Sequence, residues 1–486
     1  MNGKLRLFLC FILMVSGFSA NHLSAQRVIS MQEALDVAIE NSPQIRTAKL
    51  NLERSRELLN AQKAALKSRF SLTLEPFHYT HDRQFNDLFS TWNTSETKQS
   101  SGVFSIAQPL LLTDGTIALR NQFAWRNSYS EFQDTKSETY NNNLYLTYDQ
   151  PLFTYNRTRL ALADVQLDLE NASLNYNLQE LVLEQRVAQA FYQSFQNKMS
   201  VQVTKEEVQN TEASYNIIKN KVDAGLAAQE ELYQAELNLA TARSSLQNEQ
   251  VSLENALDQF KQMIGLSLFE DITVTAEVQQ DSIPIDLDKA LDYGLKYRLE
   301  LKQRALDIES ARANLVRSSA TNEFEGNLSL SYGIFGNDEK VNDIYQAPTQ
   351  NQDFSISFEI PIFDWGEKKS RIKAAEASVK NSQLSEEDEK NNIIIGIRQA
   401  YRNVQNQKLQ IDIAQQNVKV AQLTYDINLE RYENGDLTSM DLNLYQNQLS
   451  QKKIGLVDAM IAYKLALLDL KVESMWDFIK NRPVLE

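Results

Sequence analysis

The sequence lacks most features of a compact, cross-linked or nucleic-acid-binding protein. Its 486 residues include one cysteine, Cys10, with only 14 glycines and 8 prolines. One cysteine cannot form an internal disulfide, and so few helix-breaking residues favour long helices. No segment reaches 18 uninterrupted apolar residues, so we expect no membrane-spanning helix. The net charge of −15 repels phosphate backbones, so we expect no nucleic-acid partner.

The first 25 residues have the pattern of a secretory signal peptide. Lys4 and Arg6 are followed by an apolar core at 7–15 and by a small-residue cleavage site at 23–25. The apolar core is too short to span a bilayer. We therefore expect residues 1–25 to be removed during export, which leaves a mature chain without cysteine.

An internal duplication organises the rest of the chain. The segment YDQPLF at 148–153 reappears as FEIPIF at 358–363, and the offset of 210 residues continues without a gap for over a hundred residues. The start of each copy matches at an offset of 256 residues, so the first copy carries 46 extra residues. We expect a first structural repeat at 26–280 and a second at 281–486.

Each repeat is predicted to form a helix, strands, a long helix, a turn and a second helix. The first helices are expected at about 30–67, with a cap at Ser30, and 288–321; the long ones are expected at 157–223 and 367–433. Apolar residues recur every seven positions in the last of these helices, which is typical of side-by-side helix packing, although any coiled coil would show it. These residues are Ile397, Val404, Ile411, Val418, Tyr425 and Tyr432.

Strands with alternating polarity are predicted at 70–153 and 327–363. Leu328, Leu330 and Tyr332 alternate with small polar residues over about ten positions, as in tilted strands that cross a bilayer. A half-buried sheet in a soluble protein has the same pattern. Four or six strands cannot close a barrel alone, and open edges are not tolerated in hydrocarbon. A membrane location would therefore require several chains.

The 46 extra residues contain a predicted hairpin. Segments 103–112 and 117–125 flank Asp114-Gly115, a strong signal for a tight turn, and leave polar loops at 81–101 and 127–142. Short turns on one side and long loops on the other are typical of outer-membrane strands. The strand number stays open: each chain contributes four strands if the hairpin forms a plug or a separate sheet, and six if it joins the wall.

Several stretches resemble the TolC family of outer membrane efflux proteins. They are ISMQEALDVA at 29–38, NSP at 41–43, RYENG at 431–435, Leu437, Asp441-Leu442 and Tyr445-Gln446. The resemblance covers nearly the whole mature chain. It implies a mainly α-helical homotrimer whose transmembrane β-barrel in the outer membrane continues as a helical tunnel through the periplasm. It also implies an export channel, for efflux or type I secretion, that works with a periplasmic adaptor and an inner-membrane pump.

Two helix–turn–helix tips, at 224–228 and 434–438, are the candidate functional sites. Their central residues are Ala224, Gly225, Leu226, Asn434, Gly435, Asp436 and Leu437, and the glycines suit a reversing turn. The resemblance implies that the tips contact the adaptor. It also implies that Asp441, with its repeat partner Glu231, narrows the periplasmic gate and that Tyr432 latches it closed. The alternative for each acidic residue is a solvated helix face.

No motif for a catalytic, metal-binding or cofactor-binding site is present. His78 and His81 are the only histidines of the mature chain and have no neighbouring thiol in the sequence. We therefore expect neither an enzyme nor a bound cofactor. The competing interpretation is a periplasmic coiled-coil adaptor or scaffold without a pore, although an adaptor should have one hairpin between small β-domains rather than two tandem copies.

Overall fold

The computed structural model describes residues 26–87, 90–131, 134–276 and 283–484. The expected signal segment, Cys10 included, lies outside the described residues. The chain forms two compact units: the first contains residues up to 47, 178–297 and 393 onward, and the second contains 48–177 and 298–392. Within the described ranges, no helix combines the length and the apolar character needed to cross a membrane.

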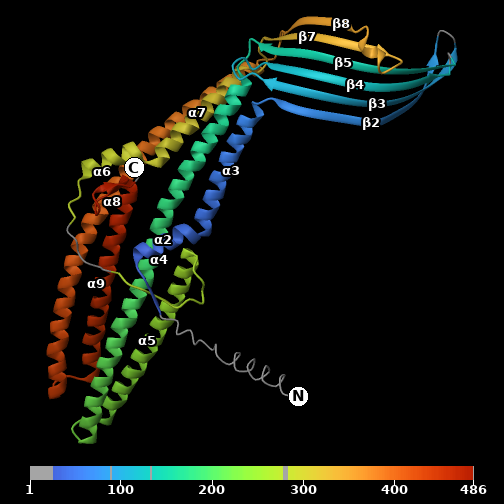
Figure 1. The fold of residues 1–486 in the computed structure, drawn as a ribbon. Coiled ribbons are helices and arrows are strands. Elements are labelled where there is room, and N and C mark those ends of the chain that lie inside the picture. Colours follow the sequence, from blue (N-terminus) through green and yellow to red (C-terminus); the bar gives the residue numbers. More distant parts are fainter. Residues whose placement is uncertain (1–25, 88–89, 132–133, 277–282, 485–486) are drawn as a thin grey trace, which may run out of the picture. The chain divides into compact units, whose positions relative to one another are not determined.

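The second unit contains a six-stranded antiparallel sheet in the order β2-β3-β4-β5-β7-β8 (Figure 1). The strands are β2 (Arg69–Asn86), β3 (Thr91–Pro109), β4 (Thr116–Ser130), β5 (Thr135–Leu152), β7 (Glu325–Asp338) and β8 (Thr349–Glu359). A short 3-10 helix, η1 (Asp343–Tyr345), lies between the last two. The extra hairpin, β3 and β4, lies inside the sheet and is neither a plug nor a separate sheet. The sheet of one chain therefore has six strands, including both strands of the extra hairpin.

The strand register gathers apolar side chains on one face of the sheet. Phe70, Ile106, Leu119, Leu146 and Tyr332 form one row across five strands. Successive side chains of a strand point to opposite faces, so the neighbouring row lies on the other side. That row contains Ser71, Ser105, Arg120, Tyr145 and Gly333. One face of the sheet is thus mainly apolar, although Asn121 and Asn142 also lie on it, and the other is largely polar, as the alternating sequence predicted.

The predicted polar loops at 81–101 and 127–142 are wrong, because most of these residues belong to strands. β2, β3 and β5 have 18 or 19 residues, where about ten were expected. Trp125 pairs with Tyr140 at the end of the apolar face, and the next row on that face is polar: Lys98, Asn127 and Glu138. Polar residues pair through their backbones as apolar ones do. The polar residues therefore show where the apolar part of the sheet ends, but the strands themselves continue beyond it.

The turn around Asp114-Gly115 is wider than the predicted two-residue turn. It reverses the chain over 110–115, where the Leu110 N–H donates to the Gly115 carbonyl (2.8 Å). The Asp114 carboxylate accepts hydrogen bonds from the backbone N–H groups of Arg157 (3.1 Å) and Thr158 (2.8 Å), at the start of α4 (Arg157–Asp223). A carboxylate at a helix N-terminus satisfies unpaired N–H groups and the helix dipole. The turn therefore caps a helix.

The first helix of each repeat is divided in two, which the sequence did not predict. The pairs are α2 (Met31–Asn41) with α3 (Pro43–Ala65), and α6 (Leu287–Tyr297) with α7 (Leu299–Ser319). Pro43 explains the first break, because proline disfavours helical backbone at the preceding residue. The second break, at Arg298, lacks a proline and is not explained by the local sequence. As predicted, Ser30 caps α2 by accepting a hydrogen bond from the Glu33 N–H (3.3 Å).

Two helical hairpins dominate the first unit (Figure 1). One joins α4 to α5 (Gln229–Ile264), and the other joins α8 (Glu367–Asn434) to α9 (Ser439–Ser474). Short two-stranded sheets pair β1 (Arg27–Ile29) with β6 (Ile272–Val274) and β9 (Trp476–Asp477) with β10 (Arg482–Pro483). The predicted heptad residues of α8 face the interior, since five of the six are no more than 6% exposed.

Candidate functional site

The two hairpin tips have the same backbone geometry. Gly225 and Gly435 have φ angles of +73° and +88°, a left-handed conformation that glycine adopts without strain. In each tip the N–H of the glycine and of the next residue donate back to carbonyls of the last helical turn. The pairs are Gly225–Val222 (2.9 Å), Leu226–Lys221 (2.7 Å), Gly435–Tyr432 (3.1 Å) and Asp436–Arg431 (2.9 Å). Both helices thus end in the hydrogen-bond pattern typical of a glycine C-cap.

The second tip has an additional clasp around Asp441. The Thr438 hydroxyl accepts a hydrogen bond from the Asp441 N–H (3.2 Å) and donates one to the Asp441 carboxylate (2.8 Å). At the first tip, Ala228 occupies the cap position and makes no side-chain cap bond. Asp441 is therefore held in the first turn of α9, whereas Glu231 in the first turn of α5 lacks this clasp.

A cavity of about 260 Å³ lies between the tips and brings together most of the predicted site residues. Its lining includes Glu231, Tyr432, Asp441, Leu226, Gly435, Asp436 and Leu437. Ala224, Gly225 and Asn434 are not among its lining residues. Three of the lining residues are acidic, whereas Lys221 is the lone cation that lines it. The tip cavity therefore concentrates negative charge.

Tyr432 joins the two hairpins from a buried position. Its side chain is 1% exposed, and its hydroxyl donates to the Ser214 carbonyl on α4 (3.1 Å). Lys221 donates from Nζ to the Tyr432 carbonyl (2.7 Å), and the same Nζ lies 5.3 Å from the centre of the ring. Two hydrogen bonds and a cation–π contact thus link α8 to α4.

Lys221 was not among the predicted site residues. The duplication carried a signal for it, because Lys221 and Arg431 are repeat partners in the last turns of α4 and α8. A cation there compensates the helix dipole and can reach nearby carbonyls. The sequence could not show that Lys221 uses a carbonyl of the other hairpin.

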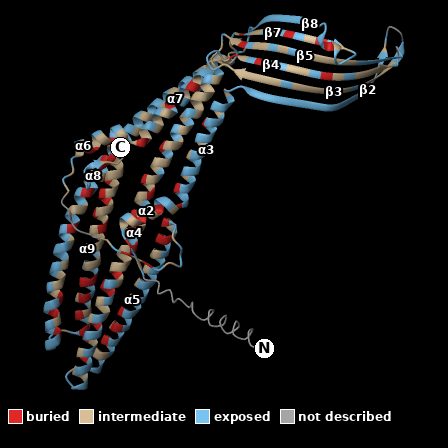
Figure 2. Cartoon of the chain, viewed as in Figure 1, coloured by how far each residue is buried: buried red, intermediate tan, exposed pale blue. Residues whose placement is uncertain are grey.

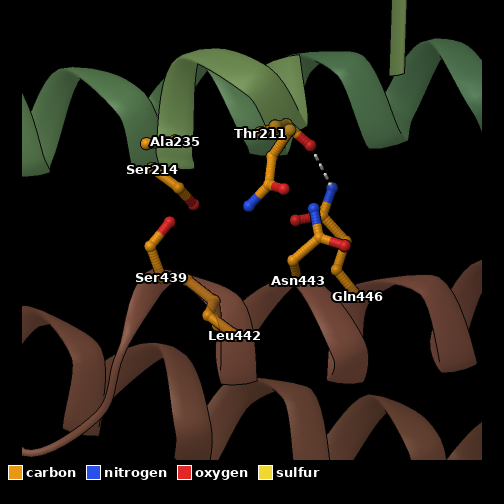
Figure 3. A pocket seen from close by; sticks show the side chains of 8 residues that line it. Thr211, Ser214, Ala235, Ser439, Leu442, Asn443 and Gln446 are labelled. Carbon is orange, nitrogen blue, oxygen red and sulfur yellow. Dashed lines mark hydrogen bonds between the residues drawn. The ribbon is translucent and has the colours of Figure 1, made fainter. Parts of the chain in front are cut away.

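A second polar contact between the two hairpins joins α9 to α4 (Figure 3). Gln446 is 3% exposed and donates from Nε2 to the Thr211 hydroxyl (3.0 Å) and to the Glu207 carbonyl (2.6 Å). Ser214 and Ser439 lie nearby in the same pocket. Burial raises the pKa of the Glu207 carboxyl. The hairpins are therefore joined near their tips by individual polar contacts as well as by apolar packing.

His78 and His81 do not form a metal site. They lie three residues apart on β2, so their side chains point to opposite faces of the sheet. The His78 ring lies 3.3 Å from the Glu75 carboxylate and the His81 ring 3.5 Å from that of Glu96. In the part of the chain that the structure describes, no three His, Cys, Asp or Glu side chains are grouped to hold a metal ion.

Comparison with known proteins assigns the family. Residues 116–266 and 291–472 match the family described as outer membrane efflux protein, which covers more than half of the chain. The chain belongs to this family. It is an outer membrane protein of the TolC type with a periplasmic helical part, and the match favours a channel over an adaptor or scaffold.

Individual relatives are distant in sequence but share the fold. The cation efflux system protein CusC of Escherichia coli K12 is 22% identical over 265 residues, 54% of this chain and 57% of that protein. The chain thus spans little more than half the length of this relative. TolC of the same organism is 21% identical over 364 residues, 73% of each chain. The CmeC outer membrane channel of Campylobacter jejuni has a TM-score of 0.70 at 15% identity, with 94% of this chain and 87% of that one covered.

We predict that alkaline pH weakens the Tyr432 link. Burial raises the pKa of this phenol to about 12. Because the folded state holds the proton more tightly, the stabilisation is complete below about pH 10 and is lost as the pH rises towards 12. When the pH is raised from neutral to about 11, the melting temperature measured by circular dichroism should fall further in the wild type than in Tyr432→Phe. The control Tyr233→Phe, at a residue 63% exposed, should behave like the wild type. Equal pH dependence in all three proteins would contradict the assignment.

Proposed function

We propose that three copies of this chain form a passive exit channel in the outer membrane. An inner-membrane pump and a periplasmic adaptor would deliver the substrates, as in efflux or type I secretion. One observation carries the proposal: a single chain combines a sheet with one apolar face and two long helical hairpins with an acidic cavity at their tips. The sheet suits a bilayer, and the acidic tips suit an entrance that binds cations.

The surface of α8 supports assembly with other copies. Besides its buried heptad seam, α8 carries a second apolar stripe with spacings of three, four and seven residues. Its members are Leu409, Ile413, Val420, Leu423 and Ile427, each 50–61% exposed. Helical residues at these spacings share one face, so the stripe is a continuous seam. A neighbouring protomer would cover it.

A charge in this stripe should prevent assembly. Ile413→Glu places a carboxylate in the middle of the seam, where burial against a neighbour would cost several kcal/mol. We expect heat-sensitive trimers to disappear from detergent extracts of the outer membrane, as judged by gel electrophoresis of unheated samples. The matched control is Gln383→Glu, which adds the same charge at an exposed polar position of α8 that lies 26 residues before Leu409, the first member of the stripe. Normal trimers of Ile413→Glu would show that the stripe is not the interface.

The acidic residues at the tip would form the gate. In a trimer, three copies of Asp441 and three of Glu231 would surround one axis, and rings of carboxylates attract cations. The few polar contacts at the tip, between Tyr432 and Ser214, Lys221 and Tyr432, and Gln446 and Thr211, would hold it closed. Opening would exchange these contacts, while the heptad residues farther from the tip, such as Val404 and Ile411, stay packed.

The substitution Asp441→Asn should reduce cation selectivity and block by multivalent cations in planar-bilayer recordings. The amide oxygen of the new side chain can still accept the hydrogen bond from the Thr438 hydroxyl, so the clasp and the fold should be retained. The substitution removes one negative charge from each protomer and therefore three from the trimer. Asp388→Asn, on the same chain but outside the tip cavity, serves as the matched control. If Asp441→Asn conducts with wild-type selectivity, Asp441 is not part of the gate.

The exposed residues of the tips would contact the adaptor. Leu226 in the first tip is 80% exposed, and Met440, two residues beyond the second tip, is 70% exposed, so an apolar side chain is exposed in or next to each tip. Asp436 adds an exposed charge beside the turn of the second tip. An apolar residue with a neighbouring charge suits a small docking surface for another protein.

Reversing the tip charge with Asp436→Lys should abolish export and leave the channel assembled. The turn is retained, because Asp436 contributes its backbone N–H to the cap. Export is measured as resistance of cells to a pump substrate, and assembly as trimers in the outer membrane. The control Glu254→Lys makes the same reversal on α5 outside the tip. Full resistance with Asp436→Lys would mean that the adaptor does not use this tip.

A further inference from the structure

The two outer strands of the sheet differ from the four inner ones in exposure (Figure 2). Every residue of β8 is exposed, and so is every residue of β2 except the last. The inner strands β3, β4 and β5 are mostly half-buried. Large apolar side chains are uncovered at both edges: Phe70, Leu72 and Leu74 are 63–66% exposed, and Phe354, Ile356 and Phe358 are 46–66% exposed.

Both edges also present backbone groups that need partners. Among the described residues, no strand pairs with the outer side of β2 or of β8. In hydrocarbon each unpaired N–H or C=O costs several kcal/mol, so an open edge is not stable there. Joining β2 to β8 of the same chain would close only six strands. The interior of a barrel of about eight strands is already filled by side chains, so a barrel of six strands would leave no open channel.

We propose that β8 of each protomer pairs with β2 of the next, so that a trimer closes an 18-stranded barrel. This inference rests on the trimeric channel proposed above. Strand direction permits the pairing, because six antiparallel strands place β2 and β8 in opposite orientations. The new junction is then antiparallel like every other pair in the sheet. A chain with an odd number of strands would instead bring two parallel strands together.

The side chains favour a definite register at this junction. If Arg69 lies opposite Glu359, opposite charges meet on the polar face, where both side chains are exposed. Ser71 then lies opposite Ser357. On the apolar face Phe70 meets Phe358, and Leu72 meets Ile356. Both strands also have their helix-proximal ends at this point, since β2 begins at Arg69 and β8 ends at Glu359.

The same register gives a reasonable barrel geometry. The pairing ladder across the sheet places Arg69 level with Asp353 on β8. In the proposed junction, Arg69 of the next protomer pairs with Glu359, six residues further along β8 than Asp353. The strand register therefore shifts by six residues for every six strands around the barrel. With about 3.3 Å per residue and about 4.8 Å between strands, this shift corresponds to a strand tilt of roughly 35°, within the range of closed barrels.

An 18-stranded barrel would be much wider than one with two strands per repeat. Barrel diameter grows about linearly with strand number, so 18 strands give roughly 1.5 times the width of twelve. Barrels of this size leave an aqueous channel. The outer-membrane part would then not limit the size of the cargo, and selection would fall to the helical tips.

Cysteine cross-linking tests the junction directly. Cys10 is the only cysteine of the sequence and lies in the expected signal segment, so introduced cysteines have no competitors. Ser71→Cys with Ser357→Cys places two thiols opposite each other on the water-facing side, at a separation that suits a disulfide. After oxidation of intact outer membranes, most chains should migrate as covalent dimers and trimers on denaturing non-reducing gels. A reductant should return them to monomers.

The matched control moves one thiol to the opposite face. Ser71→Cys with Ile356→Cys uses the same strands but points the thiols away from each other, and it should give at least tenfold less cross-linking. A maximum with Ser355→Cys or Glu359→Cys in place of Ser357→Cys would support the junction with a different tilt.

Three results would overturn the inference. A disulfide within one chain would mean that β2 closes on its own β8. Cross-linking of Ser357→Cys to Ala118→Cys would mean that β8 pairs with β4 and that β2 and β3 lie outside the barrel. Trimers that export normally but do not cross-link would refute the junction and leave the proposed function intact. Loss of trimers from the wild-type membrane would instead refute the proposed function itself.

Discussion

The need to pair the backbone at both edges of the sheet determines how this protein can exist in a membrane. The sheet has a mainly apolar face. Its inner strands pair their backbone groups on both sides, whereas β2 and β8 pair on one side only. Water could form hydrogen bonds with the unpaired backbone groups of these edges, whereas lipid chains could not. In the proposed trimer, copies of the chain would pair these edges within hydrocarbon. The exposed apolar stripe on α8 presents the same requirement for the helices, through uncovered side chains instead of backbone groups.

The tips follow a different physical rule from the long seams. Removing buried heptad residues such as Val404 and Ile411 from the side chains that they pack against would cost several kcal/mol of free energy. The helices are therefore not expected to separate along these seams. The link between Tyr432 and Ser214 and the link between Gln446 and Thr211 are single hydrogen bonds, each with a net contribution of about 1 kcal/mol. In the proposed channel, this division would let the tip open while the long seams stay packed.

Sequence periodicity predicted the element order, the long helices and the polarity of the strands, because these depend on local spacing. Strand ends were wrong at 81–101 and 127–142, because polar residues continue a β-ladder as well as apolar ones. The break at Arg298 had no local signal. The contacts that Lys221 and Gln446 make with the other hairpin could not be predicted from sequence either. Their partners lie more than 200 residues away, so only the packing of the two hairpins brings them together.

The two repeats share a fold but differ in two structural features. Both copies form the same hairpin with the same glycine cap, so neither the extra strands nor the clasp is needed to fold a repeat. The first copy alone has β3 and β4, which widen the sheet. The second copy alone has the Thr438–Asp441 clasp, which fixes a carboxylate beside the tip cavity. In the proposed channel, the extra strands of the first repeat would set the width of the barrel and the ordered carboxylate of the second would act at the tip, so that conduction and selection could change independently.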